Sequence, residues 1–242
     1  MVNLLRLLAI ALITAILGTV GILSCLAVPS GNAVLPLARI WARIIFSLCR
    51  VNLTVQGGSR ISAPGPYLFL SNHQSQFDIL AVVLAIPLQF RILAKQELFY
   101  IPIFGWVLKL SGFVGIDRSN REKAIRSLEL AAQRLRGGTS LLIYAEGTRS
   151  PDGKLLPFKK GGFVLAIQAG VPIIPITIQG SREILPKGSL RIRPGTIQLG
   201  IGEPIDPARY SLDEKERLMQ EVRTAMERAM ARGAAPKEER HT

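Results

Sequence analysis

The sequence predicts an α/β fold with a mixed, largely buried sheet flanked by helices and preceded by an N-terminal hydrophobic two-helix membrane motif. Three observations support this. After residue 51, short apolar runs alternate with longer amphipathic segments, which is typical of strands alternating with helices. The chain has 242 residues with 48% hydrophobic content, enough for one sizeable core. Before residue 51, two long apolar segments dominate.

The first apolar segment, residues 7–28, holds no charged residue and is long enough for a membrane helix of about 20 residues. A signal peptide is a competing interpretation, but no A-x-A cleavage site follows closely. A lipoprotein processing site at Cys25 is another, although Leu23 fits it poorly. A helix that crosses the bilayer and one that enters a single leaflet are both compatible with the segment.

The second segment, residues 33–51, has apolar residues at near-helical spacing and a basic side formed by Arg39, Arg43 and Arg50. Such a helix is expected to lie in the headgroup plane with Trp41 at the interface. Positive charges flank the first helix on both sides. They favour a protein of the inner membrane whose larger domain faces the cytoplasm.

Three parts are expected: membrane-associating helices at 1–50, an α/β domain at 51–232 and a loose charged tail at 233–242. Apolar alternation and turn residues set the bounds of the elements in the domain. The predicted strands are 51–56, 66–70, 91–94, 113–116, 140–144, 173–178, 190–193 and 196–201. The predicted helices are 79–86, 103–110, 120–135, 161–168 and 212–230.

The net charge of +13 and the pI near 10.4 predict an anionic partner such as lipid headgroups or a phosphorylated substrate. Nucleic acid is not expected, because no nucleic-acid-binding module is recognisable and the amino terminus is hydrophobic. The two cysteines, Cys25 and Cys49, suggest neither a disulfide framework nor a zinc site.

The segment 70–78 joins a predicted buried strand to a predicted buried helix, a place where polar groups point from a sheet edge into a cleft. His73 lies in this turn, and imidazole has the unperturbed pKa best suited to a general base near neutrality. Asp78, on the following helical turn, can accept from one ring nitrogen and fix the tautomer. The structural alternative is a carboxylate that only decorates the start of its helix.

Further polar clusters follow other apolar strands. Arg118 and Arg149 come where the chain leaves the sheet, and a planar guanidinium suits phosphate oxygens. Glu146, Gly147 and Thr148 form a predicted tight turn in which the glycine permits close backbone approach. Each cluster alone also fits a structural role, as an ion pair, a turn or a solvated patch. The clusters are 112–118, 144–150 with 157–162, and 171–176.

Their order and spacing resemble the glycerolipid acyltransferase family, in particular the 1-acyl-sn-glycerol-3-phosphate (lysophosphatidic acid) acyltransferases. The family's HX4D block is matched by His73 and Asp78. Tyr144 and Ala145 replace the family's familiar Phe-Pro, which removes no ionisable group. The resemblance covers roughly residues 51–207. The other blocks are matched at residues 112–118, 146–150 and 171–176.

The resemblance implies a membrane enzyme of phospholipid biosynthesis that transfers an acyl chain from a thioester to the sn-2 hydroxyl of 1-acyl-glycerol-3-phosphate, making phosphatidic acid. It implies that His73 is the general base, that Asp78 orients it, and that the acceptor hydroxyl attacks the thioester directly. The other implied site residues are Lys95, Arg118 and Arg149 for the phosphate, and Glu146, Gly147 and Thr148 for the shape of the acceptor site.

No metal or cofactor is expected; the co-substrate is acyl-CoA or acyl-carrier protein, and the partners are lysophosphatidic acid and the bilayer. One alternative keeps the chemistry on another lysolipid, such as a lyso-ornithine lipid. Another is a lipid hydrolase with Ser71 or Ser75 as nucleophile, although no G-x-S-x-G elbow is present. A non-enzymatic basic membrane-binding protein is the third, and it leaves the ordered blocks unexplained.

Overall fold

The computed structural model describes residues 2–28, 30–61, 65–117 and 119–234. Within these residues seven strands form one sheet. The strands are β1 (Val51–Gln56), β2 (Leu68–Ser71), β3 (Phe90–Lys95), β4 (Val114–Ile116), β5 (Ser140–Tyr144), β6 (Ile173–Gln179) and β7 (Gly195–Ile201). Their order is β1-β7-β6-β2-β5-β3-β4, and neighbours are parallel except for the antiparallel pair β6 and β7. The predicted mixed α/β sheet is confirmed.

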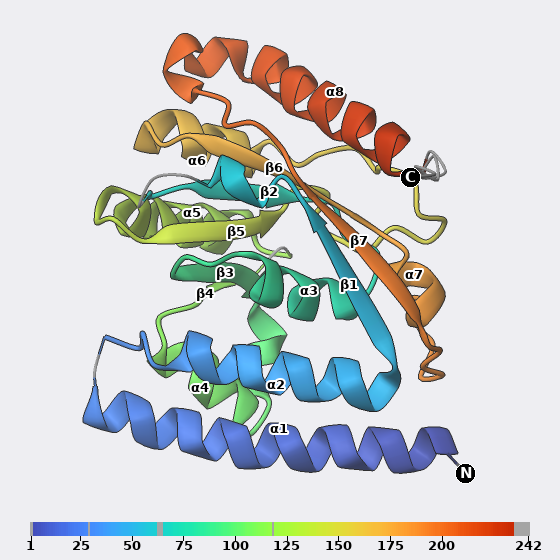
Figure 1. The fold of residues 1–242 in the computed structure, drawn as a ribbon. Helices are drawn as coiled ribbons and strands as arrows, with labels where there is room; N and C mark the ends of the chain where they lie inside the picture. The colour runs from blue at the N-terminus through green and yellow to red at the C-terminus, as the bar shows by residue number, and fades with distance from the viewer. Residues whose placement is uncertain (1, 29, 62–64, 118, 235–242) are drawn as a thin grey trace.

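Helices cover both faces of the sheet (Figure 1). Side chains of α2, α3 and α7 form one apolar core with one face, and those of α5, α6 and α8 form a second core with the other. The predicted helices are present within a few residues of their expected ends. The helices are α1 (Val2–Ala27), α2 (Val34–Cys49), α3 (Phe77–Ala85), α4 (Phe104–Leu110), α5 (Arg121–Arg136), α6 (Gly161–Ala169), α7 (Ser181–Ile184) and α8 (Lys215–Ala234).

The strands alternate between the two cores because successive side chains of a strand point to opposite faces. In β5, Leu141 and Ile143 pack with the α5 side, whereas Leu142 and Tyr144 pack with the α3 side. Strands buried on both faces are near-continuous runs of apolar residues, which is why the sequence shows them so clearly. Tyr144, the last residue of β5, therefore faces α3.

The helix α1 lies along one side of the molecule, antiparallel to α2 and opposite α8 (Figure 1). By length and composition it can cross a membrane. It packs against α2 and α4, and the Trp41 Nε1 atom of α2 donates a hydrogen bond to Thr14 Oγ1 at 2.9 Å. Its outer side is a continuous exposed apolar surface, formed by Leu4, Leu5, Leu8, Leu12, Ile16, Val20, Leu23 and Leu26.

The helix α2 forms a layer of the core on one side, while Ile40, Arg43 and Ile44 are exposed on it, and its predicted place in the headgroup plane stays a prediction. Ala42, Ile45 and Cys49 are almost fully buried, and the helix packs between α1 and α3. Arg39, expected on a basic outer side, instead donates hydrogen bonds to the carbonyl oxygens of Val83, Ile86 and Leu88 at the end of α3. An amphipathic helix has the same sequence period whether its apolar side meets lipid or protein.

The predicted strand at residues 190–193 is also wrong. Leu190 is exposed and Ile192 is buried, which is the alternation that suggested a strand. The backbone N–H of Ile192 donates to the Asn3 side chain and that of Arg193 donates to the Ile184 carbonyl, so no neighbouring strand is paired. The segment is a loop between α7 and β7. At the C-terminus, α8 ends at Ala234, and the rest of the predicted tail lies outside the described residues.

Candidate active site

The described candidate residues lie at or just after the carboxyl ends of three adjacent strands, β2, β5 and β3. β2, β5, β3 and β4 are parallel neighbours, and their registers pair Ser71 with Tyr144 and Lys95 with Ile116. His73 follows β2, Glu146 follows β5 and Lys95 ends β3. The carboxyl edge of an open α/β sheet is the usual place for a ligand site. The fold therefore gathers segments that are far apart in the sequence.

His73 and Asp78 form a close pair. The His73 Nδ1 atom lies 2.7 Å from Asp78 Oδ2, and the Asp78 side chain is fully buried in the first turn of α3. The same oxygen accepts from the backbone N–H groups of Gln74 and Ser75, at 2.6 and 2.9 Å. Because an ionised carboxylate only accepts, Nδ1 carries the proton and Nε2 presents its lone pair. That is the tautomer a general base requires.

The face of the imidazole is also fixed. The His73 ring stacks on the Tyr144 ring, with centroids 3.9 Å apart and planes 16° from parallel. Tyr144 is buried, and its hydroxyl has no hydrogen-bond partner among the described residues. Burial, and then the charge of Asp78, raises the pKa of Tyr144 well above its ordinary value, so the phenol remains neutral.

Glu146 holds the main chain of the His73 loop. Its Oε2 accepts from the His73 backbone N–H at 3.0 Å, and its Oε1 accepts from the Leu156 backbone N–H at 3.0 Å. Gly147 next to it has a φ of +70°, which a residue with a side chain rarely adopts. Burial of the carboxyl raises the pKa of Glu146 to about 7, against the opposing effect of its two backbone donors.

Two further contacts, which the sequence did not indicate, complete the support of His73. Asn72 is buried, and its side chain exchanges hydrogen bonds with the main chain of Ile178 in β6, at 2.9 and 2.7 Å. The His73 carbonyl accepts from the Ser150 backbone N–H at 2.7 Å. The loop is thereby joined to both β6 and the turn after β5. An Asn before a His in a turn does not reveal such a partner in the sequence.

The predicted phosphate-binding residues are placed less tightly. Arg149 is half-buried after the turn of Glu146, Gly147 and Thr148. The Lys95 side chain is mostly exposed, and its ammonium lies 2.8 Å from Glu97 Oε1. Arg118 lies outside the described residues. No hydrogen bond or ion pair among the described residues joins Lys95 to His73 or to Arg149.

Lys187 is a residue of this site that sequence reasoning missed. Its Nζ atom lies 3.2 Å from Thr148 Oγ1 and 3.5 Å from the Arg149 carbonyl oxygen. It comes from the loop after α7, in a stretch without any motif. Its ammonium adds positive charge beside the two residues that the motif had indicated. Only the folded chain shows this proximity.

Neither serine of the hydrolase alternative is arranged as a nucleophile. Ser71 and Ser75 are fully buried. The Ser71 hydroxyl donates to the Asn72 carbonyl at 2.9 Å, and the Ser75 hydroxyl donates to the Leu185 carbonyl at 2.8 Å. A triad serine would instead donate to the histidine. These contacts give both serines a structural role.

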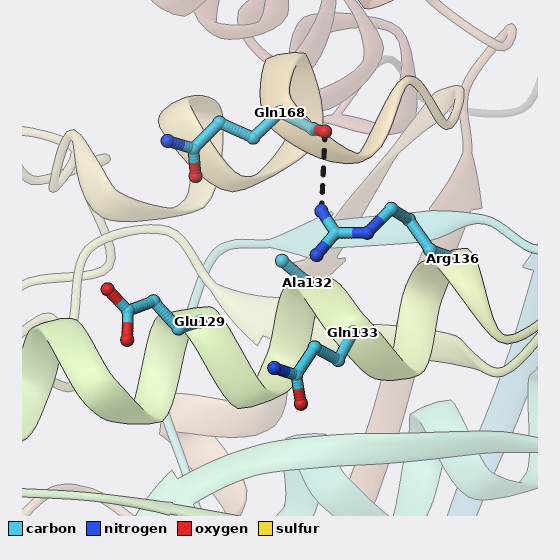
Figure 2. Close-up of a pocket in the computed structure, with 5 residues that line it drawn as sticks. All are labelled: Glu129, Ala132, Gln133, Arg136 and Gln168. Atoms are coloured by element: carbon cyan, nitrogen blue, oxygen red, sulfur yellow. Dashed lines mark hydrogen bonds between the residues drawn. The ribbon is translucent and has the colours of Figure 1, made fainter.

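A groove of about 440 Å³ lies between α5 and α6 (Figure 2). Its lining is largely polar, and the Arg136 guanidinium donates to the Gln168 carbonyl at 3.5 Å across it (Figure 2). None of the candidate site residues lines this groove. Among the described residues no three His, Cys, Asp or Glu side chains gather in the way that a metal site would require.

Comparison with known proteins places this arrangement among acyltransferases. A family model described as Acyltransferase matches residues 52–179, more than half of the chain. A chloroplastic 1-acyl-sn-glycerol-3-phosphate acyltransferase of Brassica napus is 35% identical over 70% of the chain and 49% of its own length. A 1-acyl-sn-glycerol-3-phosphate acyltransferase of Limnanthes alba is 33% identical over 85% of the chain and 74% of its own length. The chain thus spans about half the length of the Brassica relative.

A solved structure shares the whole fold. The crystal structure of the 1-acyl-sn-glycerophosphate acyltransferase PlsC from Thermotoga maritima superposes with a TM-score of 0.85 at 27% identity. The match covers 98% of this chain and 97% of that one. It includes the N-terminal helices as well as the sheet.

Proposed function

The chain belongs to the acyltransferase family, among proteins like the 1-acyl-sn-glycerol-3-phosphate acyltransferases, and we propose that it acylates the sn-2 hydroxyl of 1-acyl-glycerol-3-phosphate to make phosphatidic acid. The observation that carries this proposal is the close His73–Asp78 pair at the carboxyl edge of the sheet; the His73 carbonyl accepts from Ser150, next to Arg149, and Lys187 contacts the Arg149 carbonyl. It combines a general base with positive charge suited to an anionic acceptor.

The proposed reaction is a direct transfer. His73 Nε2 takes the proton of the acceptor hydroxyl while the hydroxyl oxygen attacks the thioester carbonyl carbon. Asp78 stabilises the imidazolium that forms. Collapse of the tetrahedral intermediate breaks the carbon–sulfur bond, and the proton on His73 passes to the leaving thiolate. No enzyme nucleophile is needed, which agrees with the structural roles of Ser71 and Ser75.

The acceptor's phosphate is proposed to bind Arg149 and Lys187, with Lys95 and Arg118 as further predicted contacts. Arginine binds a phosphate through two parallel hydrogen bonds, which fixes direction as well as position. A fixed phosphate orients the sn-2 hydroxyl beside His73, and positioning of this kind contributes on the order of several kcal/mol to catalysis. Lyso-ornithine lipid lacks that phosphate, so the basic site favours 1-acyl-glycerol-3-phosphate.

The place of the enzyme is proposed to be the cytoplasmic face of the inner membrane. The α1 helix is long and apolar enough to cross a bilayer, and its outer side is exposed. Acyl-CoA and acyl-carrier protein both supply a thioester and both carry negative charge that suits the basic surface. The lysolipid and its product reside in the bilayer, so a membrane-bound site meets its substrate without extracting it.

The test is acyl transfer from a labelled acyl thioester to 1-acyl-glycerol-3-phosphate in vesicles, comparing the wild type with His73→Ala. Labelled phosphatidic acid should form with the wild type and fall by a factor of at least about 100 in the variant. Ser71→Ala serves as the matched control, because it alters the same turn without touching the base. Labelled free fatty acid in place of phosphatidic acid would instead establish a hydrolase.

A further inference from the structure

A loop of unusual composition, residues 185–194, connects α7 to β7; we call it the basic loop. Lys187, Arg191 and Arg193 are exposed in it, and no acidic residue occurs between residues 184 and 202. None of the three cations forms an ion pair among the described residues. Leu190, in the middle, exposes 72% of its surface. The loop thus presents an apolar side chain between unpaired cations.

The basic loop is tied to the first turn of α1. The Asn3 Nδ2 atom donates to the Leu190 carbonyl at 2.8 Å, and Asn3 Oδ1 accepts from the Ile192 backbone N–H at 3.0 Å. Ile192 is buried, which fixes the loop to the core on its other side. In Figure 1 the loop descends from α7 toward the amino end of α1. Leu190 therefore lies near the amino end of α1, where Leu4 and Leu5 are also exposed.

The basic loop is also tied to the candidate active site. Its first residue, Leu185, is buried, and its carbonyl accepts the hydroxyl of Ser75 in the His73 turn at 2.8 Å. Two residues later, Lys187 contacts Thr148 Oγ1 and the Arg149 carbonyl. One short loop thus joins the amino end of α1 to the turn that carries the predicted phosphate-binding arginine.

We propose that the basic loop is a second membrane contact, in which Leu190 enters the interface of an anionic bilayer while Arg191 and Arg193 bind lipid phosphates. The surface then has two anchors, α1 and the loop. Because the loop is hydrogen-bonded to the His73 turn and to Thr148, this contact sets the acceptor site at headgroup level. This proposal rests on the proposed function for the identity of the lipid acceptor. Binding of the basic loop to the bilayer does not itself require catalysis.

A bilayer fits the basic loop better than an acidic protein does. Leu190 is exposed near the amino end of an apolar helix that is long enough to cross a membrane, and an exposed leucine among basic residues matches the boundary between acyl chains and headgroups. Each basic residue near an anionic surface strengthens membrane binding by a similar increment. An acidic carrier protein would use the cations alone and leave Leu190 in water.

The test places an environment-sensitive nitrobenzoxadiazole dye on the full-length protein through Leu190→Cys, after replacing Cys25 and Cys49 with serine. The protein is reconstituted into phosphatidylcholine vesicles, with or without phosphatidylglycerol. Dye emission should shift to the blue and be quenched by spin-labelled lipid, more strongly with phosphatidylglycerol. Leu130→Cys, exposed on α5, is the matched control and should show neither effect. A dye at position 190 that stays in water in both vesicles would overturn the proposal.

The charge requirement is tested in the same labelled protein. Arg191→Gln with Arg193→Gln should reduce the population of the buried dye about tenfold to thirtyfold in phosphatidylglycerol vesicles. Arg121→Gln with Arg126→Gln removes the same charge from exposed positions of α5 and should leave the dye buried. If the two pairs of substitutions had equal effects, the bilayer would attract the net charge of the protein and not the basic loop in particular, and the proposal would be wrong. A response only to added acyl-carrier protein would assign the loop to that protein instead. No substrate is present, so loss of acyl transfer would not affect these readouts.

Discussion

The imidazole of His73 and the phenol ring of Tyr144 stack face to face, with ring centroids 3.9 Å apart. Tyr144 ends β5, and its register partner Ser71 ends β2 two residues before His73. Asp78 holds one edge of the imidazole and Tyr144 holds one face, so the ring cannot rotate without losing both contacts. An electron-rich ring also stabilises a neighbouring cation, and His73 becomes an imidazolium when it takes a proton.

Two substitutions of Tyr144 distinguish the contribution of its aromatic ring from that of its hydroxyl. Tyr144→Phe keeps the stack and removes a buried hydroxyl that has no partner among the described residues. It should keep kcat within about threefold and raise the free energy of unfolding by about 1 kcal/mol. Tyr144→Leu removes the stack, so kcat should fall about tenfold at nearly constant KM.

The two variants are each other's control. Thermal unfolding checks the predicted stabilisation by Tyr144→Phe, and steady-state kinetics separate the effects on kcat and KM. A leucine variant with a normal kcat and a raised KM would show that Tyr144 fills space rather than positions the imidazole.

Asp78→Asn tests the tautomer. The carboxylate oxygen accepts from three donors, His73 Nδ1 and the backbone N–H groups of Gln74 and Ser75. An amide keeps the size of the side chain but no longer stabilises the imidazolium, so kcat should fall by a factor on the order of 10⁴ with a small change in KM. Single-turnover kinetics with labelled thioester measure this loss. An asparagine variant within tenfold of the wild type would remove Asp78 from the mechanism.

The raised pKa of Glu146 leads us to expect that the stability of the protein depends on pH. The pKa of its carboxyl is raised from an ordinary 4.5 to about 7. The folded protein therefore holds a proton that the unfolded chain releases above pH 4.5, and the free energy of unfolding decreases as the pH rises toward 7. At and above pH 7, the raised pKa of Glu146 lowers the free energy of unfolding by about 3 kcal/mol. Thermal unfolding should show that the wild type loses more stability between pH 5 and pH 7.5 than Glu146→Gln does.

Other groups titrate in both proteins and cancel in that comparison. The glutamine variant should also be less active at both pH values, because an amide oxygen satisfies only one of the two backbone donors, on His73 and Leu156. Parallel stability curves for the two proteins would mean that Glu146 titrates near its ordinary pKa.

The sheet could be predicted from the sequence because its strands are buried on both faces. Runs such as Leu141 to Ile143 are apolar throughout, and turn residues separate them from the helices that follow. Local patterns also located His73, Asp78 and the turn of Glu146, since each motif is contiguous. The packing of α2 on the core could not be predicted, because its apolar period is the same against lipid and against protein.

Contacts between distant segments were beyond the sequence for a different reason. The stack of Tyr144 on His73 depends on the register of β2 and β5, and the contact of Lys187 with Thr148 depends on the path of a loop without a motif. The alternation of Leu190 and Ile192 gave a false strand, because one side chain enters the core while the other remains in solvent. Register and loop path are properties of the folded chain.

Lys187 provides the last prediction, which concerns acceptor affinity. Its ammonium lies against Thr148 Oγ1 and the Arg149 carbonyl, on the turn that carries a predicted phosphate-binding residue. Lys187→Ala should raise KM for 1-acyl-glycerol-3-phosphate about fivefold to tenfold with little change in kcat, since a charge-assisted contact to phosphate is present in both ground and transition states. Arg149→Ala should raise it further because a two-point contact is lost.

The control for this prediction is Lys154→Ala, which removes an exposed lysine just after the same turn without a contact to Thr148. Its KM should equal that of the wild type. A second control uses monoacylglycerol, an acceptor without phosphate, for which Lys187→Ala and the wild type should turn over equally slowly. If Lys187→Ala weakens both acceptors alike, its contact with Thr148 supports the turn and not the phosphate. A selective effect on the phosphorylated acceptor would place the headgroup between the turn after β5 and the basic loop.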